Sequence, residues 1–141
     1  MDEDCYGAGK YCAIEKGDST YKMKGRQIIQ EDLRQKCLYN RYYNETSTRH
    51  IWWEYMAYVH QNCYNAITEE CSENAHLELN IPFTQTTNCV KNSFSHADWT
   101  KATVVNSIID EELVYWKSYG SGLYPSIVIN NRTYRGQLEK L

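Results

Sequence analysis

The six cysteines are the residues of this chain best suited to redox or metal chemistry, and their spacing favours structural disulfides. A thioredoxin-type site needs two cysteines two residues apart at a helix N-terminus, where the helix dipole and the second thiol lower the pKa of the attacking thiol. The sequence has no such pair, and no close pair of cysteines stands near two histidines, as a zinc site requires. We therefore predict no cofactor, no metal and three disulfides among Cys5, Cys12, Cys37, Cys63, Cys71 and Cys89.

Six cysteines permit fifteen pairings, and the sequence alone cannot choose among them. Cys5 and Cys12 would close a short, glycine-containing loop. Cys37 and Cys63 fall on the apolar faces of two predicted helices, so that a bridge would staple a helical hairpin. Cys71 and Cys89 bracket a shorter helical pair in the same way. We expect the pairs Cys5–Cys12, Cys37–Cys63 and Cys71–Cys89.

Other side chains give little support for catalysis. The four histidines, His50, His60, His76 and His96, titrate in the pH range of a secretory or endosomal lumen, but lone histidines usually lie at the surface. His50 and Glu54 stand four residues apart without a third ligand or a general base. No Gly-x-Ser-x-Gly turn is present to hold a nucleophilic serine. We therefore predict no catalytic residue and a protein that is not an enzyme.

Trp52 and Trp53 are a candidate binding feature. Adjacent residues of a helix point about 100° apart, so both tryptophans cannot occupy the same core face. One is expected in the core and the other, taken as Trp53, at the surface. An exposed tryptophan is either a binding anchor, since Trp is enriched at interface hot spots, or a residue packed under a neighbouring domain.

The elements that must position these residues are mostly helical. Apolar residues recur with helical spacing in three segments, which predicts helices at 27–39, 51–63 and 99–117. We also expect a short helix at 71–79, ended near Pro82, and one more short helical turn at 84–90. At the C-terminal end, Pro125 precedes the β-branched run Ile127-Val128-Ile129. Asn130 and Asn131 then suit the positive φ angles of a two-residue hairpin turn. We expect an α+β domain over 1–141, with a disulfide loop at 1–21, a mainly helical part at 27–117 and a β-hairpin at 124–136.

Composition limits the compartment and the partners. An even number of cysteines and two sequons, which make Asn44 and Asn131 candidate glycosylation sites, fit an oxidising extracytoplasmic compartment. A net charge of −3 without a basic cluster excludes nucleic acid as a partner. No apolar run approaches the roughly 18–20 residues of a membrane span, so we expect no membrane insertion. No signal peptide precedes Cys5, and we interpret the chain as an excised luminal piece.

Several motifs, in order, resemble the central luminal region of plant-type vacuolar sorting receptors. The similarity covers nearly the whole chain, and its most distinctive part is the C-terminal motif. The motifs are Cys5-Tyr6-Gly7-Ala8-Gly9-Lys10-Tyr11-Cys12-Ala13, Asp32-Leu33-Arg34-Gln35-Lys36-Cys37, Trp52-Trp53-Glu54-Tyr55 and Ile127-Val128-Ile129-Asn130-Asn131-Arg132-Thr133-Tyr134-Arg135-Gly136-Gln137-Leu138.

The resemblance implies a thioredoxin-like fold dominated by a disulfide-stapled helical insertion, with a small sheet and a cis-proline at Pro125. These receptors are type I membrane proteins that carry soluble cargo from the Golgi toward the vacuole or lysosome. It therefore implies a luminal place in Golgi, prevacuolar or endosomal compartments. The implied partners are cargo sorting peptides and the neighbouring protease-associated and EGF-like domains of the parent chain. The residues expected to face cargo are Trp53, Arg132, Tyr134 and Arg135.

Two other functions stay open at this point. A thiol-disulfide oxidoreductase-like domain, expected to be redox-inactive, is supported by the proline hairpin and opposed by the missing Cys-x-x-Cys. A secreted, disulfide-rich interaction protein would explain the cysteines but not the ordered match to the receptor lumen.

Overall fold

The computed structural model describes residues 3–13, 23–119 and 126–136. Contacts between residues divide the chain into two compact units, Met1–Asn106 and Ser107–Leu141, and each is described here by itself. The first unit contains a stapled N-terminal loop and four helices. The second contains one helix and a β-hairpin.

The N-terminal loop is held closed by a disulfide. Strand β1 (Cys5–Tyr6) pairs in antiparallel fashion with β2 (Tyr11–Cys12), and a 3-10 turn, η1 (Gly7–Gly9), joins them. The Cys5–Cys12 bridge closes the loop, as predicted. Gly7 adopts a φ of +62°, which strains any other residue, and a Cβ there would make a tight contact of 3.2 Å with the side chain of Val104. This close approach locks the loop onto a segment almost a hundred residues away.

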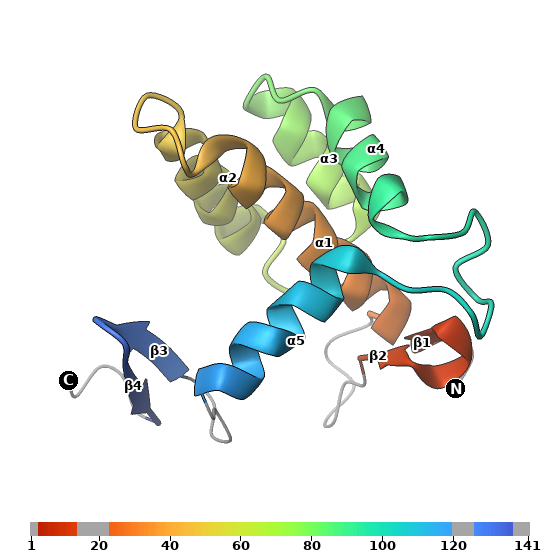
Figure 1. The fold of residues 1–141 in the computed structure, drawn as a ribbon. Helices are drawn as coiled ribbons and strands as arrows, with labels where there is room; N and C mark the ends of the chain where they lie inside the picture. The colour runs from red at the N-terminus through yellow and green to blue at the C-terminus, as the bar shows by residue number, and fades with distance from the viewer. Residues whose placement is uncertain (1–2, 14–22, 120–125, 137–141) are drawn as a thin grey trace. The chain divides into compact units, whose positions relative to one another are not determined.

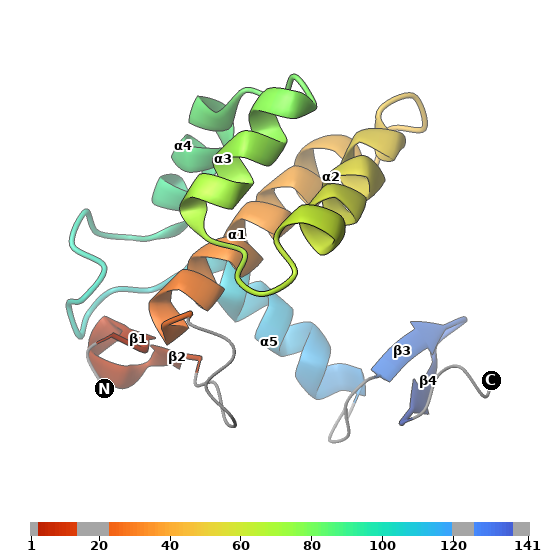
Figure 2. The same cartoon turned by 180° about the vertical axis from the view of Figure 1, so that it is seen from behind.

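Four helices form the body of the first unit. Helix α1 (Gly25–Tyr42) lies between α2 (Arg49–Asn62) and α4 (Phe83–Ser93), and α3 (Glu69–Glu78) packs against the other three. Figure 1 and Figure 2 show this arrangement from opposite sides. The Thr68 side chain caps α3 by accepting a hydrogen bond of 3.2 Å from the N–H of Cys71. The helices predicted at 27–39, 51–63, 71–79 and 84–90 are thus confirmed, with small differences at their ends.

The core of this unit follows the predicted apolar stripes. Tyr55 and Val59 of α2 are fully buried against Leu38 of α1, as the spacing of three and four requires. Partly buried side chains, among them Trp52, cover this cluster. The other buried members are Cys63, Ala75 and Ile81.

Two of the three predicted disulfide pairings were wrong. Cys37 of α1 is bonded to Cys89 of α4, and Cys63 is bonded to Cys71. The prediction placed Cys37 opposite α2, the next helix along the chain, whereas the Cys37 side of α1 faces α4. The short connection after α2 turns the chain back, which brings Cys71 at the start of α3 within reach of Cys63. The bridges therefore join α1 to α4 and α2 to α3.

The predicted helix at 99–117 is correct only in its second half. Helix α5 begins at Ser107 and ends at Tyr119. Residues 94–106 instead form an irregular segment tied to the N-terminal loop. The N–H groups of Gly7 and Ala8 donate to the carbonyls of Trp99 (2.9 Å) and Thr100 (3.1 Å), contacts between distant segments that periodicity cannot reveal.

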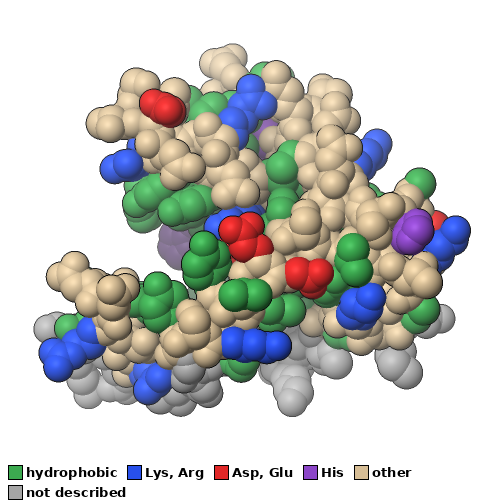
Figure 3. Space-filling view, in the orientation of Figure 1, with side chains coloured by type: hydrophobic (Ala, Val, Ile, Leu, Met, Phe, Trp, Pro, Cys, Tyr) green, Lys and Arg blue, Asp and Glu red, His purple; other side chains and the backbone are tan. Residues whose placement is uncertain are grey.

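The second unit contains α5 and the predicted hairpin. Strands β3 (Ser126–Ile129) and β4 (Arg132–Arg135) pair in antiparallel register, with Ile129 opposite Arg132. Asn130 and Asn131 have φ angles of 49° and 62°, so the two-residue turn predicted from these asparagines is confirmed. No side chain of α5 is buried, and Figure 3 shows hydrophobic side chains among charged ones along it. Pro125 lies outside the described residues, so its cis peptide bond stays a prediction.

Candidate functional site

Four aromatic side chains form a surface cluster at the junction of α1 and α2, which we call the aromatic patch: Tyr39, Tyr43, Trp52 and Trp53. The rings of Tyr39 and Tyr43, one helical turn apart, are stacked with centroids 4.4 Å apart. Trp52 meets both rings edge-on, at 5.4 and 5.5 Å. Trp53 is 55% exposed and contacts Trp52 at 4.7 Å. Trp53 is thus at the surface, as predicted, whereas Trp52, expected in the core, is only partly buried against it.

Hydrogen bonds and two cations hold the aromatic patch in place. The indole N–H of Trp52 donates to the carbonyl of Gln35 at 3.2 Å. The Lys36 ammonium lies 4.7 Å from the centre of the Tyr39 ring, and the Arg49 guanidinium lies at the same distance from Tyr43. Arg49 also donates through Nε to the carbonyl of Tyr43 at 2.8 Å. Each such cation–π contact at an exposed site is worth about 0.5–1 kcal/mol, so both help to fix the tyrosine rings.

The hairpin presents two different faces, because side chains alternate along each strand. Arg132 and Tyr134 share one face with Ile127 and Ile129, which are 38% and 50% exposed. Arg135 lies on the opposite face, where its guanidinium donates to the carbonyl of Tyr119 at the end of α5. Of the three hairpin residues expected to face cargo, two therefore lie on one face and Arg135 lies on the other. Trp53 belongs to the other unit, so the structure brings together only the hairpin residues.

A buried polar network, which sequence reasoning missed, joins the helices of the first unit. The hydroxyl of Tyr55 donates to Glu31 Oε1 at 2.8 Å and lies 2.7 Å from the hydroxyl of Ser72. Arg34 donates through Nε to Glu31 Oε2 at 2.8 Å. Burial raises the pKa of Glu31, and the Arg34 guanidinium and the bond from Tyr55 oppose that rise. Each polar group in this network has a partner, so the network fixes the packing of α1, α2 and α3.

His76 extends this network to α4 and was wrongly expected at the surface. Its side chain is fully buried between α3 and α4. Nδ1 lies 2.7 Å from the carbonyl of Ser72, and Nε2 lies 2.8 Å from the Thr86 hydroxyl. A neutral imidazole with its proton on Nδ1 satisfies both contacts, since Nδ1–H donates to the carbonyl and the hydroxyl donates to Nε2. Burial lowers the pKa of His76, and the Arg34 guanidinium lowers it further.

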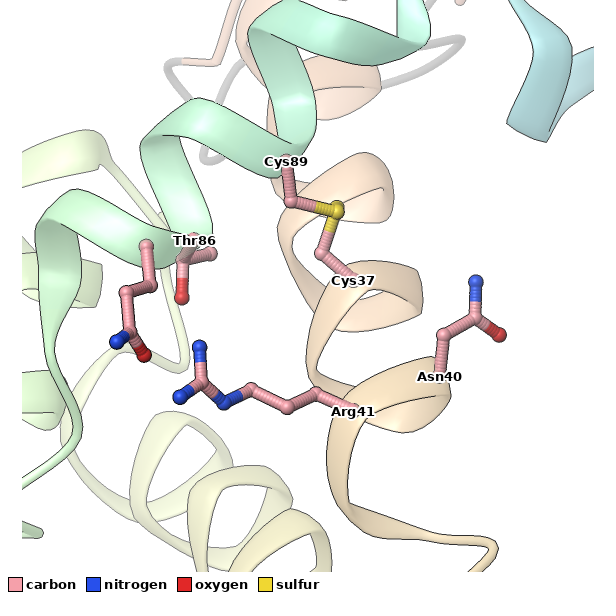
Figure 4. Close-up of a pocket in the computed structure, with 6 residues that line it drawn as sticks. Cys37, Asn40, Arg41, Thr86 and Cys89 are labelled. Atoms are coloured by element: carbon pink, nitrogen blue, oxygen red, sulfur yellow. A yellow bond between two sulfur atoms is a disulfide. The ribbon is translucent and has the colours of Figure 1, made fainter.

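All six cysteines are in disulfides, so the structure presents no free thiol for exchange chemistry. The Cys37–Cys89 bridge forms one wall of a hollow of about 290 Å³ between α1 and α4. Figure 4 shows Arg41 extending from α1 toward Thr86 on α4, below the bridge. The Arg41 guanidinium also lies 5.3 Å from the ring of its neighbour Tyr42.

The two candidate glycosylation sites occupy exposed turns. Asn44 lies in the loop between α1 and α2, next to Tyr43 of the aromatic patch. Asn131 is the second residue of the hairpin turn. Across residues 3–13, 23–119 and 126–136, no three His, Cys, Asp or Glu side chains are grouped to hold a metal ion. None of the described helices combines the length and the apolar character needed to cross a bilayer.

Comparison with known proteins finds vacuolar sorting receptors both in the family model and among individual relatives. The family model of the vacuolar sorting receptor thioredoxin-like domain matches residues 1–141. Vacuolar-sorting receptor 7 of Arabidopsis thaliana is 29% identical over 144 residues, and receptor 3 of the same plant is 30% identical over 147 residues. Vacuolar-sorting receptor 1 of Pisum sativum is 29% identical over 147 residues. Each match covers 96% of this chain and 22% of the length of the relative.

Proposed function

The chain belongs to the vacuolar sorting receptor thioredoxin-like domain family, and we propose that it is a non-enzymatic luminal module of such a receptor. In this role it contributes to binding soluble cargo that travels from the Golgi to the vacuole or lysosome. The names of its relatives support a receptor role. Because the chain spans 22% of their length, its neighbours in this proposal are the protease-associated and EGF-like domains of a longer protein.

The aromatic patch is the observation that carries this proposal. Trp, Tyr and Arg are the residue types that dominate the binding energy of protein interfaces, and all three occur together here. Trp53 is exposed at a place where Trp52 and Tyr43 already fix its surroundings. A partner that covers Trp53 therefore gains apolar contact without ordering a flexible loop. In this proposal, cargo and not a neighbouring domain covers Trp53.

The hairpin offers a second contact of a different kind. A sorting peptide in extended conformation can add to a strand edge, where backbone hydrogen bonds give affinity and alternate side chains give specificity. The face that carries Arg132 and Tyr134 would read the side chains of such a peptide, because Arg135 is bonded to the end of α5. The Arg132 guanidinium favours an acidic residue at that position of the peptide.

The test compares Trp53→Ala with Tyr64→Ala in the full-length receptor. Tyr64 is a matched control, since it is 64% exposed and contacts His60, outside the aromatic patch. Soluble proteins of the secretory pathway are passed over each immobilised protein, and the retained set is measured by quantitative mass spectrometry. We expect Trp53→Ala to weaken retention of cargo about thirtyfold, the loss that corresponds to an interface hot spot of about 2 kcal/mol.

The Tyr64→Ala protein should retain the same cargo proteins as the wild-type receptor, in the same amounts. Equal retention by wild-type protein and Trp53→Ala would remove the aromatic patch from cargo binding. Arg132→Ala and Tyr134→Ala, measured in the same way, test the hairpin separately, with Arg135→Ala as the control on its opposite face.

A further inference from the structure

A second hollow, of about 510 Å³, lies at the end of α4 and plays no part in the proposed function. We call it the Phe94 hollow. Its apolar part is made by Phe94, which is buried, and Trp99, which is half-buried. The two rings are stacked, with centroids 4.3 Å apart and planes 12° apart. The exposed side chains of Lys91, Ser95 and His96 line its polar part.

The walls of the Phe94 hollow are fixed by the N-terminal disulfide loop. The Tyr6 ring meets Phe94 and Trp99 edge-on, at 5.6 and 5.5 Å. The backbone of Trp99 accepts a hydrogen bond of 2.9 Å from the N–H of Gly7. Ser95 is bonded twice to Val105, through its own N–H and through its hydroxyl, each at 2.9 Å. The hollow is therefore pre-formed, which lowers the entropic cost of ligand binding.

One charged side chain, Lys91, is among the residues that line the Phe94 hollow. Lys91, in the last turn of α4, pairs with no acidic side chain among the described residues. Asp98 is already bonded, because it accepts from the N–H and the hydroxyl of Thr100. These bonds lower the pKa of Asp98, and the nearby charges of Lys101 and Arg26 lower it further. Asp98 therefore stays ionised, but it is bonded to Thr100 and does not line the hollow, so Lys91 is the charged side chain that an anion meets inside it.

We propose that the Phe94 hollow binds a carboxylate carried on a flat or branched apolar group. The apolar group would pack on the half-buried Trp99 ring, which the buried Phe94 ring supports by stacking against it. The carboxylate would accept charge-assisted hydrogen bonds from Lys91 and from the ring of His96, which lies 3.3 Å from the Thr103 hydroxyl. Both the last residue of a peptide and a free organic acid have this chemistry.

An NMR titration of the chain, following the indole N–H of Trp99, tests this proposal. The probes are N-acetylphenylalanine, its amide, and the tetrapeptide Ala-Ala-Ala-Phe with a free C-terminus. We expect the acid to shift the Trp99 resonance with a Kd on the order of 1 mM or lower. The amide should bind at least about tenfold more weakly, because it lacks the charge that Lys91 recognises.

Lys91→Met keeps the apolar stem of the lysine but removes its charge. It should weaken the binding of N-acetylphenylalanine about tenfold. Lys101→Met, a matched change in the same segment but outside the lining of the hollow, should leave binding unchanged. Tighter binding of the tetrapeptide than of the acid would identify a peptide terminus as the ligand, and equal binding would identify a free acid. Equal binding of acid and amide, equal losses in both lysine variants, or no shift of Trp99 would overturn the proposal.

Discussion

The two units of the chain use their apolar residues in opposite ways. The unit Met1–Asn106 contains all three disulfides and buries Leu33, Leu38 and Tyr55 almost completely. The unit Ser107–Leu141 has no cysteine, and its helix α5 leaves Leu113 and Trp116 each 44% exposed. From this comparison we expect the first unit to provide most of the stability of the chain and the second to contribute little to it.

The largest difference should come from shortening one leucine in each unit. Leu33→Ala removes a side chain that is 1% exposed and should cost about 2–5 kcal/mol, because a cavity is left in the core. Leu113→Ala, in α5, should cost less than about 1 kcal/mol, because that side chain is already near water. Urea unfolding followed by circular dichroism measures both. Similar losses would contradict the assignment of stability to the first unit.

The disulfides within the first unit should also differ in effect. Replacing Cys37 and Cys89 together by serine opens a bridge with a sequence separation of 52 and should cost about 4 kcal/mol by the loop-entropy model. The same change at Cys5 and Cys12, with a separation of 7, should cost about 2.5 kcal/mol. Non-reducing peptide mapping of the wild-type protein checks the pairing itself. A Cys37–Cys63 peptide in that map would contradict the structure.

Removing one hydroxyl tests the buried network. Tyr55→Phe deprives Glu31 of a donor in the core and should cost about 1–3 kcal/mol, the range for a buried polar group left without a partner. Tyr115→Phe is the control in the second unit, since Tyr115 is 52% exposed and should change stability by less than about 0.5 kcal/mol. If the two variants unfold at the same urea concentration, the network does not stabilise the first unit.

The smallest expected effect is a dependence of stability on pH at His76. Burial holds the pKa of His76 in the folded protein below its ordinary value of 6.5, so the unfolded chain binds the proton more readily. The stability from neutral His76 is therefore complete above pH 6.5 and is lost as pH falls through the folded pKa. The free energy of unfolding should change with pH by at most about 1.4 kcal/mol per pH unit through this group.

Glu31 changes the pH dependence of stability in the opposite direction, because burial raises its pKa. The stability that protonated Glu31 provides is lost as pH rises from 4.5 through the folded pKa. The slope of wild-type protein must therefore be compared with that of His76→Gln. His60→Gln, at an exposed histidine, is the control. An unchanged slope in His76→Gln between pH 5 and 6.5 would show that His76 is not held neutral by the fold.

Local patterns predicted the elements that depend on local physics. The spacing of Tyr55 and Val59 predicted the buried face of α2, and Asn130-Asn131 predicted the hairpin turn. The loop closed by Cys5 and Cys12 was likewise predictable, because the two cysteines are close in sequence. The family resemblance, carried by motifs along the whole chain, was confirmed by the family model.

Features that depend on the packing of distant segments were not predictable in this way. The Cys37–Cys89 bridge follows from which helix faces α1, and no periodicity gives that information. The irregular segment at 94–106 replaces a predicted helix, because its backbone is bonded to Gly7 and Ala8. Burial of His76 depends on Thr86 of another helix. The contacts of Trp53 with the Tyr43 and Trp52 rings were missed for the same reason, although the exposure of Trp53 was predicted.

Photo-cross-linking from the aromatic patch is the most direct test of the central claim that this module contacts cargo through Trp53. A benzophenone amino acid replaces Trp53 in the full-length receptor, and Tyr64, an exposed residue outside the aromatic patch, in a control protein. After irradiation in secretory vesicles, the account predicts cross-links from position 53, but not from 64, to soluble cargo proteins. Cross-links from position 53 only to other domains of the receptor itself would contradict it.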